Sequence, residues 1–321
     1  MAGQNTGVVL AAMIANGAIA VLKFIGYLLT GSPSMLAETY HSISDTGNQV
    51  LLLIGIKYSQ RGATEVHPYG YGKAQFFFAF LVSVLLFGVA GWESLKHGIH
   101  ELRAGGHGTE TGAAEFLSFT LDVSLPVDAF WVSVAILVGA ILFETYAFVK
   151  ARAELKRQMD EYGWSGYRET FSETSDITTL TAFTEDTIAL IGLVVALVGQ
   201  AASRATGNPT YDSLGAVVIG VLLMLFALLL AFENKRLILG ESLATDVERD
   251  LQAAITDHDG VAHVDDFRTM FIGTGQVLVT ADVSFDSGLE TGEIDEDIQQ
   301  LESKLEGIDD RVKLVYIEPR L

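Results

Sequence analysis

The chain contains no cysteine among its 321 residues. This absence excludes disulfide bonds and thiolate metal sites, so a metal site here has to use oxygen and imidazole ligands. Basic residues are also scarce, because 20 Lys and Arg stand against 40 Asp and Glu, and the formal net charge is -20. Such an acid excess argues against nucleic acid as a partner. It suits a salt-rich cytoplasm, and we expect a halophilic source.

Hydrophobic residues, in contrast, are abundant and gather in long runs. They make up 50% of the chain, and the mean hydropathy is positive. A membrane span needs about 20 apolar residues. Six stretches meet this length: residues 8–29, 35–58, 76–98, 128–149, 178–202 and 211–232. The N-terminus lacks the basic segment and small-residue cleavage site that would mark a removable signal peptide. The six long apolar stretches predict an integral protein of the cell membrane.

The loops between the predicted spans differ in their content of Lys and Arg, which favour the cytoplasmic side. Two loops and the end of the last span carry most of them: Lys57, Arg61, Lys73, Lys150, Arg152, Lys156, Arg157, Arg168, Lys235 and Arg236. The opposite loops carry only Arg103 and Arg204. Both termini are therefore predicted to be cytoplasmic, as an even number of spans requires.

The composition changes after residue 236, and a second domain is predicted over residues 237–321. Its apolar pattern predicts, in chain order, a helix, two strands, a helix and a strand: Thr245–His258, Val261–Phe271, Gln276–Phe285, Ile294–Leu305 and Val312–Ile317. This order predicts a small α+β ferredoxin-like (αββαβ) domain after a six-helix membrane bundle of residues 1–236. So small a domain buries little core alone, and we expect a homodimer through it.

The second predicted span carries polar side chains at membrane depth. His41 and Asp45 are four residues apart and share one helix face, and Asn48 and Gln49 extend the same stripe. A charged group at mid-bilayer costs about 2.5–3.5 kcal/mol on insertion scales. The presence of these groups therefore needs a reason.

The fifth predicted span carries two adjacent acids, Glu185 and Asp186. The apolar run after them is too short to cross a membrane alone, so both acids have to enter it. With His41 and Asp45 they form an N/O ligand set that suits zinc and, less selectively, manganese, iron or cobalt. The alternative is that the polar groups only bridge helices. Bridging explains Asn48 better than it explains crowded acids, which repel unless a cation or protons neutralise them.

The same cluster predicts a mechanism. Without metal, crowded carboxylates take up protons, and an entering divalent ion has to expel them. If the cavity opens to alternate sides of the membrane, metal and protons exchange across it. His41 is the natural proton carrier near neutral pH, together with Asp45 and Asp186.

Lys23 is a further charge inside a predicted span. If the first two spans form a hairpin about Gly31, Lys23 lies level with Glu38, and a structural ion pair neutralises both. The alternative is a lone lysine whose ammonium group reaches the membrane interface.

These stretches resemble the cation diffusion facilitator family of metal transporters, and in particular its branch with Glu-Asp on the fifth span. The matching segments are Lys23–Gly26, Thr30–Ser32, Leu36–Glu38 with His41, Ser42 and Asp45, His67–Lys73 and Asn208–Asp212. The resemblance covers nearly the whole chain. It implies efflux or organelle loading of a divalent metal, zinc foremost, by proton exchange, a homodimer, and a transport site shared by spans two and five. The metal is then the substrate, and no catalytic cofactor is implied.

In that family His41, Asp45 and Asp186 match three of the four usual ligand positions. The fourth position would be Ala182, four residues before Asp186, and alanine cannot bind metal. Glu185 is the expected substitute, although adjacent helix residues are rotated by about 100°. This departure leaves the metal open among zinc, manganese, iron, cobalt and nickel.

Some relatives bind further metal outside the membrane, and this chain has candidate residues for both accessory sites. In the loop after the second span, His67 matches one position and Glu65 can assist it, but Tyr71 stands where a second histidine would be. In the C-terminal domain the available imidazoles are His258 and His263. The alternative is a solvated acidic surface.

The sequence thus predicts a secondary transporter, not an enzyme, whose partners are divalent metal, protons and the lipid bilayer. A membrane-embedded zinc metalloenzyme is one alternative, since zinc held by His and acids activates water. No convincing nucleophile or oxyanion donor supports it. A non-transporting metal sensor is the other alternative.

Overall fold

The computed structural model describes residues 2–104, 113–116, 119–122, 128–163, 165–167, 170 and 177–320. The chain divides into two compact units. The first gathers Met1–Ile54, Phe78–Ser172 and Ile177–Phe232, and the second is built chiefly from Gly55–Phe77 and Glu233–Leu321. The first unit is a bundle of helices, and the second contains a three-stranded sheet.

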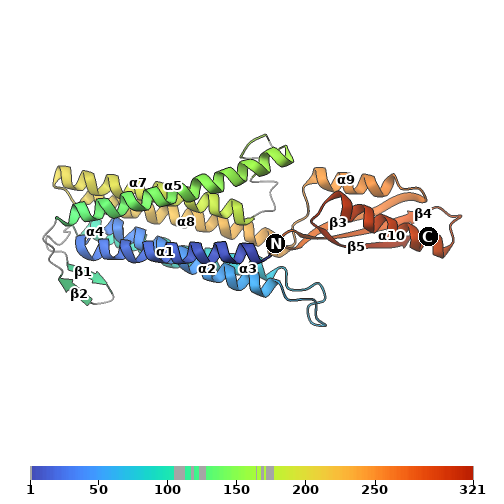
Figure 1. The fold of residues 1–321 in the computed structure, drawn as a ribbon, viewed down its shortest axis with the longest axis horizontal. Coiled ribbons are helices and arrows are strands. Elements are labelled where there is room, and N and C mark those ends of the chain that lie inside the picture. Colours follow the sequence, from blue (N-terminus) through green and yellow to red (C-terminus); the bar gives the residue numbers. More distant parts are fainter. Residues whose placement is uncertain are drawn as a thin grey trace. The chain divides into compact units, whose positions relative to one another are not determined.

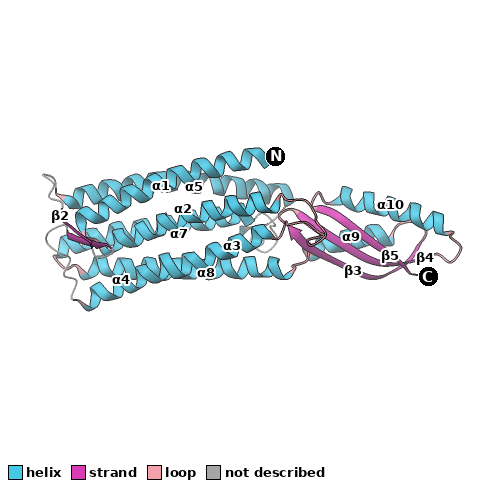
Figure 2. Cartoon of the chain, turned by 90° about the horizontal axis from the view of Figure 1, so that it is seen from below, coloured by secondary structure: helices cyan, strands magenta, loops and turns pink. Residues whose placement is uncertain are grey.

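Long helices running side by side form the bundle (Figures 1 and 2). They are α1 (Ala2–Thr30), α2 (Pro33–Ser59), α3 (Ala74–Leu85), the π-helical turn η1 (Leu86–Gly91), α4 (Trp92–Arg103), α5 (Ala129–Tyr162), α7 (Ile177–Thr206) and α8 (Thr210–Leu239). Between α4 and α5, where no element was predicted, a short hairpin pairs β1 (Ala113–Phe116) with β2 (Phe119–Asp122).

Four helical stretches in the described part of the chain are long and apolar enough to cross a membrane: Ala74–Arg103, Ala129–Glu161, Ala182–Thr206 and Thr210–Leu239. They agree with the predicted spans three to six. The described part of α1 contributes a shorter apolar helix, Asn16–Thr30. The chain therefore contains a membrane-type helical bundle, and α2 is set apart within it by its polar side chains.

Helix α5 continues well beyond the predicted end of the fourth span at residue 149. Its extension is charged, and Arg157 pairs with Glu154 at 2.6 Å and with Glu161 at 3.0 Å. Such pairs one turn apart favour continued helix. Gly163, in the left-handed conformation with φ 71°, then ends it. The basic residues at positions 150–157 therefore lie on a helix and not in a loop as predicted.

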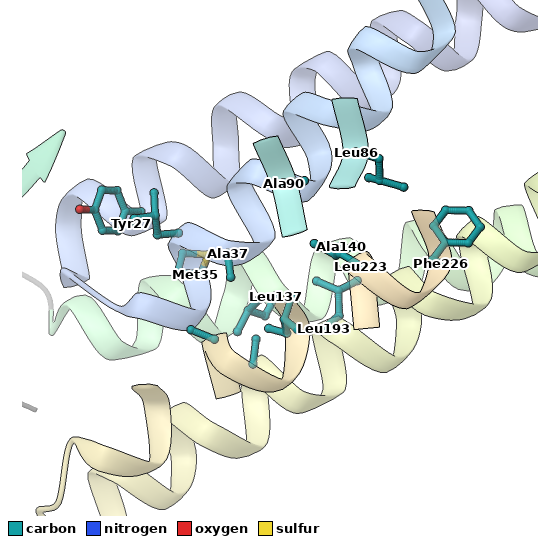
Figure 3. Close-up of a cluster of buried hydrophobic side chains, with 14 of the residues drawn as sticks. Tyr27, Met35, Ala37, Leu86, Ala90, Leu137, Ala140, Leu193, Leu223 and Phe226 are labelled. Atoms are coloured by element: carbon teal, nitrogen blue, oxygen red, sulfur yellow. The ribbon is translucent and has the colours of Figure 1, made fainter. Parts of the chain in front are cut away.

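An apolar core joins the helices at mid-bundle (Figure 3). Its largest members come from six elements: Tyr27, Met35, Leu86, Leu137, Leu193, Leu223 and Phe226. Lipid tails are as apolar as these side chains, so close packing, not exclusion from water, holds such helices together. The core thus depends on how closely the helices approach.

Glycines allow the closest of these approaches, between α4 and α8. A Cβ at Gly98 would lie 2.8 Å from the backbone nitrogen of Val217, and one at Gly220 would lie 2.6 Å from that of Leu95. Both distances are too short for any other residue. Small residues are therefore required at this crossing.

The sheet of the second unit consists of β3 (Val261–Gly273), β4 (Gln276–Phe285) and β5 (Val312–Arg320), with helices α9 (Thr245–Thr256) and α10 (Thr291–Ile308). The central strand β4 is antiparallel to β3 and parallel to β5. Helix α9 packs against β3, α10 packs against β5, and the two helices contact each other, so they cover the same face (Figure 2). The helix–strand–strand–helix–strand order agrees with the prediction.

Within this unit the loop after α2 packs tightly on the β3–β4 hairpin. A Cβ at Gly72 would overlap the carbonyl oxygen of Ile272 and lie 2.9 Å from Gly273 Cα. Beside it, Lys73 Nζ lies 3.7 Å from the sulfur of Met270. The two backbones therefore touch where only glycine fits.

Gly72→Ala is expected to destabilise this unit by about 1–3 kcal/mol, because the added methyl group forces the two backbones apart. The measurement is thermal unfolding of the purified full chain. Gly62→Ala is the matched control, since a Cβ at Gly62 meets nothing within 4 Å. A Tm for Gly72→Ala as high as that of the control would contradict the packing described.

Candidate functional site

The polar face of α2 is buried inside the bundle. His41 is 1% exposed and Asp45 is 5% exposed, and His41 Nδ1 lies 3.4 Å from Asp45 Oδ1. Within the described residues, neither ring nitrogen of His41 nor Oδ1 of Asp45 makes a hydrogen bond. Buried polar atoms without partners are costly and rare. These atoms are therefore suited to receive a ligand.

Glu185 of α7 reaches the same face of α2. Its carboxyl group lies close to the side chains of Asp45 and Asn48. The Asn48 amide can donate to a carboxylate directly. Two carboxyl groups in such contact need a proton or a cation between them, because two negative charges repel. The α2–α7 interface thus holds a place for positive charge.

Asp186 lies beside Glu185, within electrostatic range of Glu144. Glu144 is a buried acid of α5, only 8% exposed, and α5 packs along α7. Sequence reasoning missed Glu144, although an acid inside the apolar stretch 128–149 was the same signal that identified Glu185. Ala182, one turn before Asp186, offers no ligand.

Lys23 and Glu38 form an ion pair at the border of this cluster. The distance from Lys23 Nζ to Glu38 Oε2 is 2.8 Å, and both side chains are 0% exposed. Gly31, with φ 63°, turns the chain between α1 and α2 so that the two residues meet. A Cβ at Gly192 of α7 would lie 2.5 Å from Glu38 Oε1. Gly192 therefore leaves the space that Glu38 occupies.

The whole cluster is strongly acidic. It comprises Glu38, Asp45, Glu144, Glu185 and Asp186 with Lys23 and His41. Lys23 offsets one negative charge, so the remaining carboxylates require protons or cations. In this conformation no three His, Asp or Glu side chains of the described chain converge on one point that a metal ion would occupy. Metal binding therefore requires these side chains to move together.

A second polar network ties the helices where α1 meets α2. Ser133 donates to Gln200 Oε1 at 2.6 Å, Gln200 Nε2 donates to Ser32 Oγ at 3.0 Å, and Ser34 donates to Asp212. The network joins α5, α7 and α8 to the α1–α2 turn. It lines a cavity of about 400 Å³ with further acids, Glu101 and Asp128.

The loop after α2 contains His67 and Glu65, the accessory metal ligands predicted there. His67 packs on the ring of Tyr71 with centroids 4.2 Å apart, and Glu65 is exposed. Tyr71, which stands where a second histidine would be, thus packs against His67. No third potential metal ligand joins them among the described residues.

In the sheet unit His258 Nε2 lies 3.4 Å from Asp297 Oδ1 of α10. Sequence reasoning did not identify Asp297, because nothing in the sequence relates α10 to the turn after α9. His263 is exposed on β3. The structure therefore places His258 beside Asp297, an acid distant in the sequence. Metal binding by His263 stays a prediction.

Comparisons with known proteins identify the family that the chain resembles. Residues 9–239 match the family described as the cation efflux transmembrane domain. The chain is similar to the human mitochondrial proton-coupled zinc antiporter SLC30A9, with 29% identity over 301 residues that cover 92% of the chain and 50% of the relative. It is also similar to metal tolerance protein C4 of Arabidopsis thaliana, with 26% identity over 85% of the chain and 56% of the relative. The chain thus spans about half the length of these relatives.

A shorter similarity links the chain to magnetosome protein MamM of Paramagnetospirillum magneticum. The two are 35% identical over 77 residues, which cover 24% of each protein.

Lys23→Met is expected to cost about 3–5 kcal/mol of stability, because it leaves Glu38 buried without a counter-charge. The double variant Lys23→Met/Glu38→Met removes both charges and should recover most of that loss. The measurement is the free energy of unfolding in detergent. If Lys23→Met is as stable as the wild type, the pair does not hold α1 to α2.

Proposed function

Since the chain belongs to the cation efflux family of metal transporters, also called cation diffusion facilitators, we propose that it exports a divalent transition metal from the cytoplasm in exchange for protons. One observation carries this proposal: His41 and Asp45 hold buried atoms that make no hydrogen bond among the described residues, and Asp45 lies close to Glu185 of α7. A cation is the ligand that satisfies all of these groups together.

The transport site comprises His41 and Asp45 from α2 with Glu185 and Asp186 from α7. One imidazole and three carboxylates form an N/O set that suits zinc. The contact between Asp45 and Glu185 supports Glu185 as the ligand that replaces the one lost at Ala182. The human relative is named as a zinc antiporter, which also supports zinc over manganese, iron, cobalt and nickel.

Protons are the counter-substrate because the ion and the protons use the same carboxylates. When the metal leaves, Asp45 and Asp186 take up protons to stay neutral in the bilayer, and His41, beside Asp45, passes protons to and from the site. Release to the far side requires the helices to separate at the network around Gln200. The hydrogen bonds that join α5, α7 and α8 to the α1–α2 turn then break and re-form in each cycle.

The proposed setting is a cell membrane crossed by six spans, with both termini in the cytoplasm. The ferredoxin-like domain after residue 236 is proposed to join two copies of the chain. The human relative is named as mitochondrial, whereas the basic loops after spans two and four support cytoplasmic termini here. Accessory metal binding at His67 or His258 is a separate, secondary proposal.

Membership of a cation efflux family argues against the metalloenzyme alternative. The sensor alternative predicts metal binding without movement of metal. Uptake measurements therefore separate it from a transporter.

Asp45→Ala and Asp186→Ala are expected to abolish metal uptake into inverted membrane vesicles, because each removes a ligand. Glu185→Ala should weaken uptake or change the preference among zinc, manganese, iron, cobalt and nickel. Asp160→Ala, an exposed acid on α5, is the matched control and should transport normally. If Glu185→Ala keeps full activity with unchanged preference, Glu185 is not a ligand.

Zinc entry into proteoliposomes that contain the purified chain is expected to drive protons out. A pH-sensitive dye inside the vesicles should therefore report a rise in pH that Asp45→Ala abolishes. Zinc uptake without any proton movement would refute the exchange while leaving metal transport in place.

A further inference from the structure

Glu144 is a buried acid that the proposed ligand set does not use. It lies on α5 within an apolar stretch that crosses the membrane, and it is 8% exposed. A carboxylate in such a place is costly unless a cation or a proton accompanies it. Its position therefore calls for a partner.

The neighbours of Glu144 are the residues of the proposed transport site. It lies within electrostatic range of Asp45 on α2 and of Glu185 and Asp186 on α7. Within the described residues, Asp45 Oδ1 and both ring nitrogens of the neighbouring His41 are buried and make no hydrogen bond. Acids of three helices thus lie within electrostatic range of one another.

Lys23 is the nearby resident cation, and its charge also acts on Glu144. Its ammonium group is already paired with Glu38 at 2.8 Å. One lysine cannot neutralise Glu38 and Glu144 together with the acids of α7. Glu144 therefore needs a proton or a mobile cation.

We propose that Glu144 is a further determinant of cation affinity and adds a carboxylate from α5 to the transport site. This inference rests on the proposed function and extends its site from two helices to three. Glu144 contributes a carboxylate that either binds the ion or holds it against Asp186. Groups that support a metal in this way typically change its affinity about 10–100-fold when they are removed.

Equilibrium dialysis of zinc against the purified full chain in nanodiscs tests the proposal. Glu144→Gln keeps the shape of the side chain and removes its charge, so zinc affinity should fall about 10–100-fold. Glu144→Asp keeps the charge and should recover part of that loss. Glu161→Gln makes the same change at an exposed site of the same helix and should bind zinc as the wild type does.

Two results would overturn the role of Glu144. One is wild-type zinc affinity for Glu144→Gln. The other is an equal loss in Glu144→Gln and Glu144→Asp together with a lowered Tm in both, which identifies a packing role. A wild-type chain that neither binds nor transports any divalent metal would instead refute the proposed function itself, so the two failures are distinguishable.

Discussion

The need to neutralise buried charges is the constraint that organises the helical unit. An isolated charge in a bilayer is expensive, so every buried acid or base needs a counter-charge. Lys23 and Glu38 meet this need permanently, as a 2.8 Å ion pair between α1 and α2. Among the described residues, no lysine or arginine forms an ion pair with Asp45, Glu144, Glu185 or Asp186. The difference separates a structural pair from the site proposed to exchange its cations.

Glycines in the helical unit give the charged side chains their place. Gly31 turns α1 into α2 at the point where Lys23 and Glu38 become level, and Gly192 leaves room for the second oxygen of Glu38. At the crossing of α4 and α8, glycines bring the helices close enough for a dry core. Small residues thus determine where the charged ones are able to sit.

Much of this arrangement could be predicted from the sequence, because charged residues in apolar runs are conspicuous. His41, Asp45, Glu185 and Asp186 stand out for that reason, and so do Lys23 and Glu38. The order of elements in the sheet unit followed from its apolar periodicity. The family resemblance, drawn from short motifs, is confirmed by the match over residues 9–239. Four of the six spans agree with long apolar helices.

The rest depends on contacts between distant segments, which periodicity does not show. Glu144 could be recognised as intramembrane, but nothing in the sequence directs its helix toward Asp186. The packing of Gly72 on Ile272 and the pairing of His258 with Asp297 are likewise tertiary. The extension of α5 needed the charge pairs of Arg157, which a search for apolar runs ignores.

The surplus of acids over Lys23 also bears on leakage. Bare carboxylates cannot reorient cheaply through a low-dielectric interior, so an empty and fully ionised cavity would be trapped on one side. Only the metal-loaded and the protonated forms would then be able to open the site to the other side of the membrane. If the chain exchanges metal for protons as proposed, it would therefore not let protons leak across the membrane when no metal is present.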